Sequence, residues 1–192
     1  MTRKILLLAT LAVASMAALG AAIHAANPRA PENFREASIQ LPNADMLDAA
    51  ARPFALRDDI EQDAIVVINF SYTTCDSICP LGNQILQFVD DRRHEVTRPV
   101  HLLTITIDPA SDTPDKMRRT AEAFGASENW HWLTSSPAVI ADILEAADAD
   151  VTDIELHDPV FLVGEMETGR YFRSLSMPDA DEILAMLGHF DA

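Results

Sequence analysis

The stretch AIVVINFSYTTCDSICPLGNQILQFV, residues 64–89, contains both cysteines of the chain and indicates how the surrounding chain folds. Residues 64–70 are rich in β-branched side chains, as is typical of a strand covered on both faces. Beyond the second cysteine, apolar residues recur at the spacing of one helix face: Leu81, Ile85, Leu86 and Val89. The cysteines are therefore predicted to lie on a turn that joins a buried strand to an amphipathic helix.

The rest of the sequence extends this unit into a layered fold. A second strand is predicted over residues 100–108, where apolar side chains alternate with threonines. Further capping and periodicity signals predict two helices, then two strands around a turn, then a closing helix: 113–125, 136–147, 159–175 and 178–190. Strands that alternate with helices in this order indicate an α/β fold with a central mixed β-sheet flanked by helices. The order matches a thioredoxin-like fold with one extra helix.

The N-terminal segment has the features of an export signal. Basic residues precede an uncharged run over 5–23, and small residues follow up to a plausible cleavage point after Ala25. The same run is just long enough to cross a bilayer, so an uncleaved anchor is the alternative. We therefore interpret residues 1–26 as a signal peptide or N-terminal membrane anchor, 27–52 as a linker and 53–192 as the folded domain. The domain would lie in the periplasm, where cysteine pairs tend to be oxidised.

The charge balance excludes some classes of partner. The chain carries 14 basic and 30 acidic residues, a net charge of −16. Nucleic acids and anionic lipids bind to basic faces, so neither is expected to be a partner of this domain. Membrane contact is then expected only through a possible N-terminal anchor.

Cys75 and Cys79 are separated by three residues, whereas a dithiol redox motif commonly has two. The start of a helix stabilises a thiolate, because unpaired backbone N–H groups and the helix dipole both favour negative charge there. Thiolates attack disulfides and also bind metals. Residue types and spacing thus leave three interpretations: a redox pair, a structural disulfide, or two metal ligands. A loop this short constrains the unfolded chain little, which weighs against the structural disulfide.

Two thiolates suit Cu(I) or Zn(II) but leave the metal site open for a further ligand. The histidines beyond the leader are His94, His101, His131, His157 and His189. His157 differs from the others because it immediately precedes the strand expected beside the first one. If these two strands were parallel, however, the chain that enters the second strand need not lie near the cysteines. Spacing alone therefore does not decide whether it is a ligand.

Three blocks of the sequence resemble signature blocks of the Sco/SenC family of copper-binding thioredoxin-like proteins. The blocks are FSYTTCDSICP (70–80), TITIDPASDTPDKMRRTAEAFG (104–125) and LHDPVFLVGEMETGRYFR (156–173). The resemblance extends over roughly residues 53–190. Its most specific feature is the ordered occurrence of a CxxxCP motif, a DPxxDTP motif and a late histidine before a strand.

The resemblance implies a function and a ligand set. In the family the two cysteines and the late histidine bind copper, which assigns one Cu(I) or Cu(II) to Cys75, Cys79 and His157. It implies a periplasmic copper chaperone, rather than an enzyme, for the binuclear copper site of cytochrome c oxidase. The implied partners are the copper-site subunit of the oxidase and a thioredoxin-like reductant. The alternative within the family is a thiol–disulfide oxidoreductase or redox sensor that uses the same two cysteines.

Asp108 and Asp112 belong to the second block, IDPASDTP. They could form an acidic surface for a partner or support the metal site. Aspartates beside prolines and turns mostly accept hydrogen bonds from nearby backbone groups. We therefore expect a structural role for both.

Overall fold

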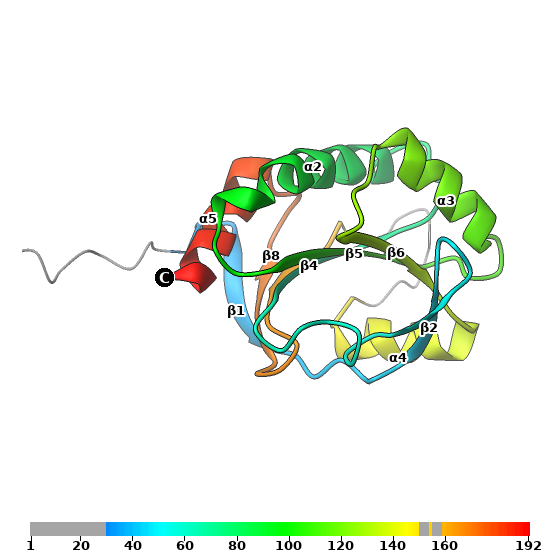
Figure 1. Ribbon diagram of the computed structural model, residues 1–192, viewed down its shortest axis with the longest axis horizontal. Helices are drawn as coiled ribbons and strands as arrows, with labels where there is room; N and C mark the ends of the chain where they lie inside the picture. The colour runs from blue at the N-terminus through cyan, green and yellow to red at the C-terminus, as the bar shows by residue number, and fades with distance from the viewer. Residues whose placement is uncertain (1–29, 150–153, 155–158) are drawn as a thin grey trace, which may run out of the picture.

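The computed structural model describes residues 30–149, 154 and 159–192. Within these residues the chain forms an eight-stranded sheet in the order β1-β8-β7-β4-β5-β6-β2-β3, with helices on both faces (Figure 1). The strands are β1 (Phe34–Ser38), β2 (Asp45–Asp48), β3 (Pro53–Ala55), β4 (Ile65–Ser71), β5 (Val100–Thr106), β6 (Trp130–Thr134), β7 (Phe161–Gly164) and β8 (Arg170–Ser174). The helices are α2 (Cys79–Arg92), the short 3-10 helix η1 (Arg93–Glu95), α3 (Pro114–Ala123), α4 (Pro137–Ala146) and α5 (Ala180–Asp191).

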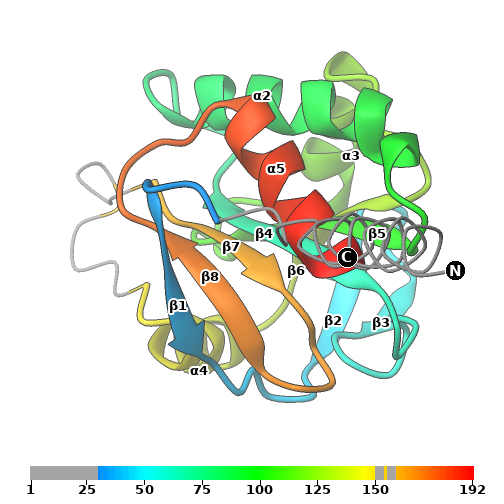
Figure 2. The ribbon, with the colours of Figure 1, turned by 90° about the vertical axis from the view of Figure 1, so that its left-hand side faces the viewer.

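The sheet is mixed, as predicted. β4, β5 and β6 are parallel neighbours, whereas β7 is antiparallel to both β4 and β8. Helices α2, α3 and α5 lie on one side of this sheet and α4 on the other (Figures 1 and 2). The predicted α/β class, with a central mixed sheet flanked by helices, is confirmed.

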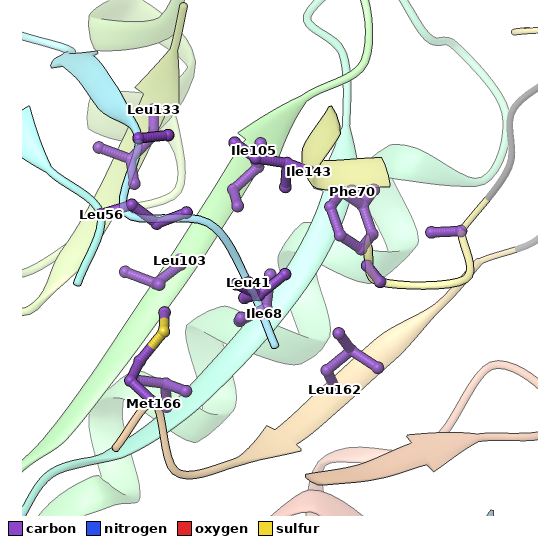
Figure 3. Packing of buried hydrophobic residues seen from close by; sticks show 14 of the residues in the cluster. Leu41, Leu56, Ile68, Phe70, Leu103, Ile105, Leu133, Ile143, Leu162 and Met166 are labelled. Atoms are coloured by element: carbon purple, nitrogen blue, oxygen red, sulfur yellow. The ribbon is translucent and has the colours of Figure 1, made fainter. Parts of the chain in front are cut away.

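Two apolar clusters, one on each face of the sheet, hold these layers together. Ile68 and Phe70 of β4 pack in the cluster that includes Ile143 of α4 (Figure 3). The alternate residues Ile65 and Val67 belong to the other cluster, with side chains of α2, α3 and α5. All seven residues of β4 are buried, because both faces of this central strand are covered. The β-branched run that predicted the first strand therefore reflects its position in the middle of the sheet.

The linker predicted over residues 27–52 is wrong for the part that includes β1 and β2. β1 pairs with β8, and β2 pairs with β3 and β6, so this segment extends the sheet at both ends. These strands have three to five residues, too few to show a clear alternation of apolar and polar side chains. Pairing with distant strands, rather than local sequence, makes β1 and β2 strands. For the same reason the sequence prediction missed β6, whose five residues lie between two helices.

The predicted signal peptide or anchor, residues 1–26, lies outside the described residues. Over 30–149, 154 and 159–192, no helix is both long enough and apolar enough to cross a membrane.

Candidate functional site

The cysteine turn leads from the last residue of β4, Ser71, to the first residue of α2, Cys79. Pro80 is the second residue of the helix, where a backbone N–H would have no partner within the helix. The backbone N–H of Cys79 donates to Cys75 Sγ at 3.3 Å. The Cys75 sulfur thus accepts a hydrogen bond from the first turn of α2, and the predicted strand-to-helix turn is confirmed.

The two thiols have different surroundings. Cys75 is partly exposed, whereas Cys79 is only 5% exposed. Partial burial opposes ionisation of Cys75. Hydrogen bonds from the Cys79 thiol and from the backbone of Ser77 and Cys79 outweigh it, and the pKa of Cys75 falls from 9.0 to about 7. Burial, and then the hydrogen bond to Cys75, raise the pKa of Cys79 to about 12. The pair therefore consists of an accessible sulfur that ionises readily and a buried one that keeps its proton.

This difference predicts selective alkylation of the metal-free, reduced protein. At pH 7 about half of Cys75 is thiolate, against roughly one per cent for a thiol of pKa 9.0. The rate of reaction with iodoacetamide should rise with pH around a midpoint near 7, and Cys75 should be modified well before Cys79. Mass spectrometry at a series of pH values measures both. The rapid phase should be absent from Cys75→Ser, and a midpoint near 9 would contradict the assignment.

Asp112 holds the cysteine turn in place through hydrogen bonds. Its carboxylate is 2% exposed and accepts hydrogen bonds from the backbone N–H of Thr73, at 3.1 and 3.2 Å to its two oxygens. The hydroxyl groups of Thr73 and Thr106 also donate to it, at 2.5 and 2.7 Å. Asp108, by contrast, accepts from the backbone N–H of Ser111 within its own turn. The structural role expected for both aspartates is confirmed. Asp112 in addition holds the cysteine turn, because its partner Thr73 lies two residues before Cys75.

The start of β7 lies at the same edge of the sheet as the cysteine turn. β7 is antiparallel to β4, and Phe161 is opposite Asn69 near the end of β4. Pro159 and Ile78, the latter within the cysteine turn, line one surface hollow. The parallel arrangement considered from the sequence is therefore wrong, because β7 enters the sheet where β4 leaves it.

The described histidines are engaged elsewhere. His94 follows α2 and its Nδ1 contacts the backbone oxygen of Asp91 at 3.0 Å. His189 is near the C-terminal end of α5, and its Nε2 lies 3.3 Å from the guanidinium of Arg170. His157 itself lies outside the described residues. Among residues 30–149, 154 and 159–192, no three histidine, cysteine or acidic side chains are grouped so that they could hold a metal ion.

His101 and His131 form a separate cluster. His101 Nδ1 lies 3.0 Å from His131 Nε2, and His101 Nε2 contacts the carboxylate of Glu61. His101 is next to Val66 in the parallel pairing of β4 and β5, near the start of both strands, so the cluster is far from the cysteine edge. Burial, and then the charge of His101, lower the pKa of His131 to about 4. The rings of these two histidines stack on each other, away from the cysteine turn.

Several solved structures with the same fold are Sco proteins. BsSco, a member of the Sco family of cytochrome c oxidase assembly proteins, is 18% identical with a TM-score of 0.69, covering 82% of this chain and 96% of its own. A SCO1/SenC family lipoprotein from Bacillus anthracis is 15% identical with a TM-score of 0.68, covering 82% and 98%. Yeast Sco1 with copper bound is 19% identical with a TM-score of 0.61, covering 80% and 92%. These likenesses confirm the thioredoxin-like fold.

A search among curated proteins finds no match to the sequence. The SCO1/SenC family model, in contrast, matches residues 55–158. This span contains the cysteine turn and the loop of Asp112, and it exceeds half of the 192 residues. The chain therefore belongs to the SCO1/SenC family.

Proposed function

We propose that the protein is a copper chaperone that holds one copper ion, Cu(I) or Cu(II), through Cys75, Cys79 and His157. The observation that carries the proposal is the sulfur of Cys75 at the start of α2, with the thiol of Cys79 hydrogen-bonded to it. Two sulfurs in contact, one of them ready to ionise, form a soft donor pair that suits copper. Copper here is cargo to be passed on, so an accessible site is an advantage.

The two cysteines would contribute differently to binding. Cys75 is about half thiolate at pH 7 and accessible to an incoming ion. Cys79 keeps its proton in the metal-free protein, so its thiol must release that proton when the sulfur becomes a ligand. Copper binding is therefore expected to release protons and to become tighter as pH rises.

The arrangement of β7 supports His157 as the third ligand. Pro159 borders the same hollow as Ile78 of the cysteine turn, and His157 precedes Pro159 by two residues. Two residues of extended chain reach about 7 Å. An imidazole in this position would add a neutral nitrogen donor to the two thiolates, and the carboxylate of Asp158 could orient it.

We also propose a client and a compartment. BsSco is described as a cytochrome c oxidase assembly protein, which supports the copper-site subunit of the oxidase as the acceptor of the copper. The Bacillus anthracis relative is a lipoprotein. This supports a periplasmic domain that is either anchored to the membrane by residues 1–26 or released by cleavage of that segment. In that compartment the cysteines would oxidise, so loading would require a reductant, for which we propose a thioredoxin-like protein.

The test is copper binding by the reduced wild type and by His157→Ala, with His94→Ala as the matched control. We expect one copper per chain in the wild type and in the control. The affinity of His157→Ala should fall by at least the roughly tenfold to hundredfold seen when even an outer partner of a metal ligand is removed. Equilibrium dialysis against a copper-buffering chelator measures both. A reduced wild type that retains no copper would overturn the proposal, and unchanged affinity in His157→Ala would remove His157 from the ligand set.

Thiol–disulfide exchange is the second candidate. The observation that favours it is the asymmetry of the pair, because an accessible, readily ionised Cys75 beside a buried Cys79 resembles an attacking and a resolving thiol. The three-residue spacing, longer than in most dithiol motifs, makes copper binding the first choice.

A further inference from the structure

A hollow beside the cysteine turn is distinct from the one that Pro159 lines. One wall comes from the turn itself, the other from one face of α3. We call it the basic hollow, and its lining residues are Thr73, Thr74, Lys116, Arg119, Thr120 and Ala123. The four residues from α3 follow the spacing i, i+3, i+4, i+7, so they lie on a single helix face. Thr74 directly precedes Cys75, so the hollow borders the segment of the turn that leads into this cysteine.

The positive charge of the basic hollow is concentrated at Lys116. Its Nζ donates to the backbone oxygen of Ser111 at 2.8 Å. No carboxylate of the described residues lies within 4.0 Å of it. Arg119, in contrast, pairs with Asp115. Lys116 therefore forms no ion pair with a described carboxylate, and its ammonium group has N–H groups left for further hydrogen bonds.

This charge is opposite in sign to the net charge of the chain, which is −16. The general field of the protein repels anions and attracts cations. Lys116, with the hydroxyl of Thr74 on the facing wall of the hollow, thus creates a local site for an anion on an otherwise repulsive surface.

We propose that the basic hollow binds a carboxylate of a small peptide disulfide while Cys75 exchanges with its sulfur. This inference rests on the second candidate function, thiol–disulfide exchange, and names its class of substrate. The hollow is lined by six residues, which fits one carboxylate and its neighbouring atoms rather than a folded partner. Lys116 and Arg119 are positioning residues, because they would hold the disulfide without reacting with it.

The exchange consists of two balanced steps. The thiolate of Cys75 attacks one sulfur of the disulfide, forms a mixed disulfide and releases the other half as a thiolate. Cys79 then attacks the Cys75 sulfur, releases the second half and gives its own proton to the thiolate that leaves. The disulfide is reduced to two thiols as the Cys75–Cys79 pair is oxidised.

Three disulfides of different charge test the proposal. Glutathione disulfide carries carboxylates, bis(2-hydroxyethyl) disulfide is neutral and cystamine is cationic. Each is reacted with reduced Cys79→Ser protein, in which the mixed disulfide at Cys75 accumulates, and the rate is followed by mass spectrometry. Each rate is divided by that of the same disulfide with a small reference thiol, which removes intrinsic differences in reactivity.

The variants are Lys116→Gln and, as the matched control, Arg118→Gln, both in the Cys79→Ser background. Arg118 has the same charge and lies on the same helix, but it does not line the basic hollow and it pairs with Asp115 and Glu122. Lys116→Gln is expected to lower the ratio of the glutathione disulfide rate to the neutral disulfide rate by about threefold to tenfold, because it removes one nearby charge. Arg118→Gln should change the ratio by less than about twofold. The effect should shrink as salt is added.

Two results would overturn the inference: an equal change in both variants, which would indicate only the general field, or no change in either. Rates with the neutral disulfide and with cystamine show whether each variant is folded and reactive. Copper content measured on Lys116→Gln, with Cys79 restored, separates this inference from the copper proposal. Normal copper binding with an unchanged ratio overturns the inference alone. A Lys116-dependent ratio in a protein that binds no copper overturns the copper proposal alone.

Discussion

A Cys75→Ser, Cys79→Ser double variant is expected to lose stoichiometric copper binding, while the reduced wild type binds one copper per chain. The hydroxyl of serine does not ionise near neutral pH and is a poor ligand for Cu(I), so both soft donors disappear. The loss should exceed that of His157→Ala, because an imidazole alone remains. The fold should survive, since Cys75 is partly exposed and only Cys79 is packed in the interior.

The same experiment on oxidised wild type provides a control that needs no substitution. A disulfide cannot supply thiolate ligands, so air-oxidised protein with no free thiol by alkylation should load as little copper as the double variant. Adding a reductant should restore loading in the wild type and leave the double variant unchanged. Equal copper retention by the reduced wild type and the double variant would exclude the cysteines as ligands. Full loading of the oxidised protein would have the same consequence.

The core of the fold and the cysteine turn could be predicted because local sequence determines them. β4 is buried on both faces and therefore has a continuous apolar pattern, and α2 begins at a proline-containing motif with helical spacing behind it. β1, β2, β3 and β6 could not be found in this way. Each is short. β1, β2 and β6 are strands because each pairs with a strand distant in the sequence, and β3 completes the sheet by pairing with nearby β2.

The same distinction separates what could be predicted of the candidate site. Cys75 and Cys79 are close in sequence, so their proximity follows from the motif alone. The direction of β7 depends on the whole chain path between α4 and β8, and it decides whether residues before Phe161 reach the cysteine edge. The basic hollow is likewise formed by two segments about forty residues apart in the chain, the cysteine turn and α3, and no sequence pattern predicted it. The spacing DPxxDTP did mark Asp112, but as a turn residue rather than as an anchor of another loop.

Asp112→Ala is expected to lower the free energy of unfolding by about 3 kcal/mol. The substitution leaves the N–H and hydroxyl groups of partly buried Thr73 and the hydroxyl of buried Thr106 without their acceptor. A buried donor that loses its partner costs roughly 1–3 kcal/mol, and water entering the space vacated by the carboxylate offsets part of the sum. Asp112→Asn should lower the free energy of unfolding less, because the amide oxygen of asparagine still accepts hydrogen bonds on one side.

Urea denaturation measures this loss, and Asp115→Ala provides the control. Asp115 lies on the exposed face of α3 beside Arg118 and Arg119, so its removal should affect stability much less. A change common to both variants would argue against a special role for the buried carboxylate.

The cysteine site should respond to Asp112→Ala as well, because Thr73 is two residues before Cys75 and loses its fixed position. In Asp112→Ala the protected thiol of Cys79 should become easier to alkylate, and copper affinity should fall although no ligand has been changed. Loss of stability with unchanged alkylation and copper affinity would show that Asp112 supports the fold but not the geometry of the cysteine turn.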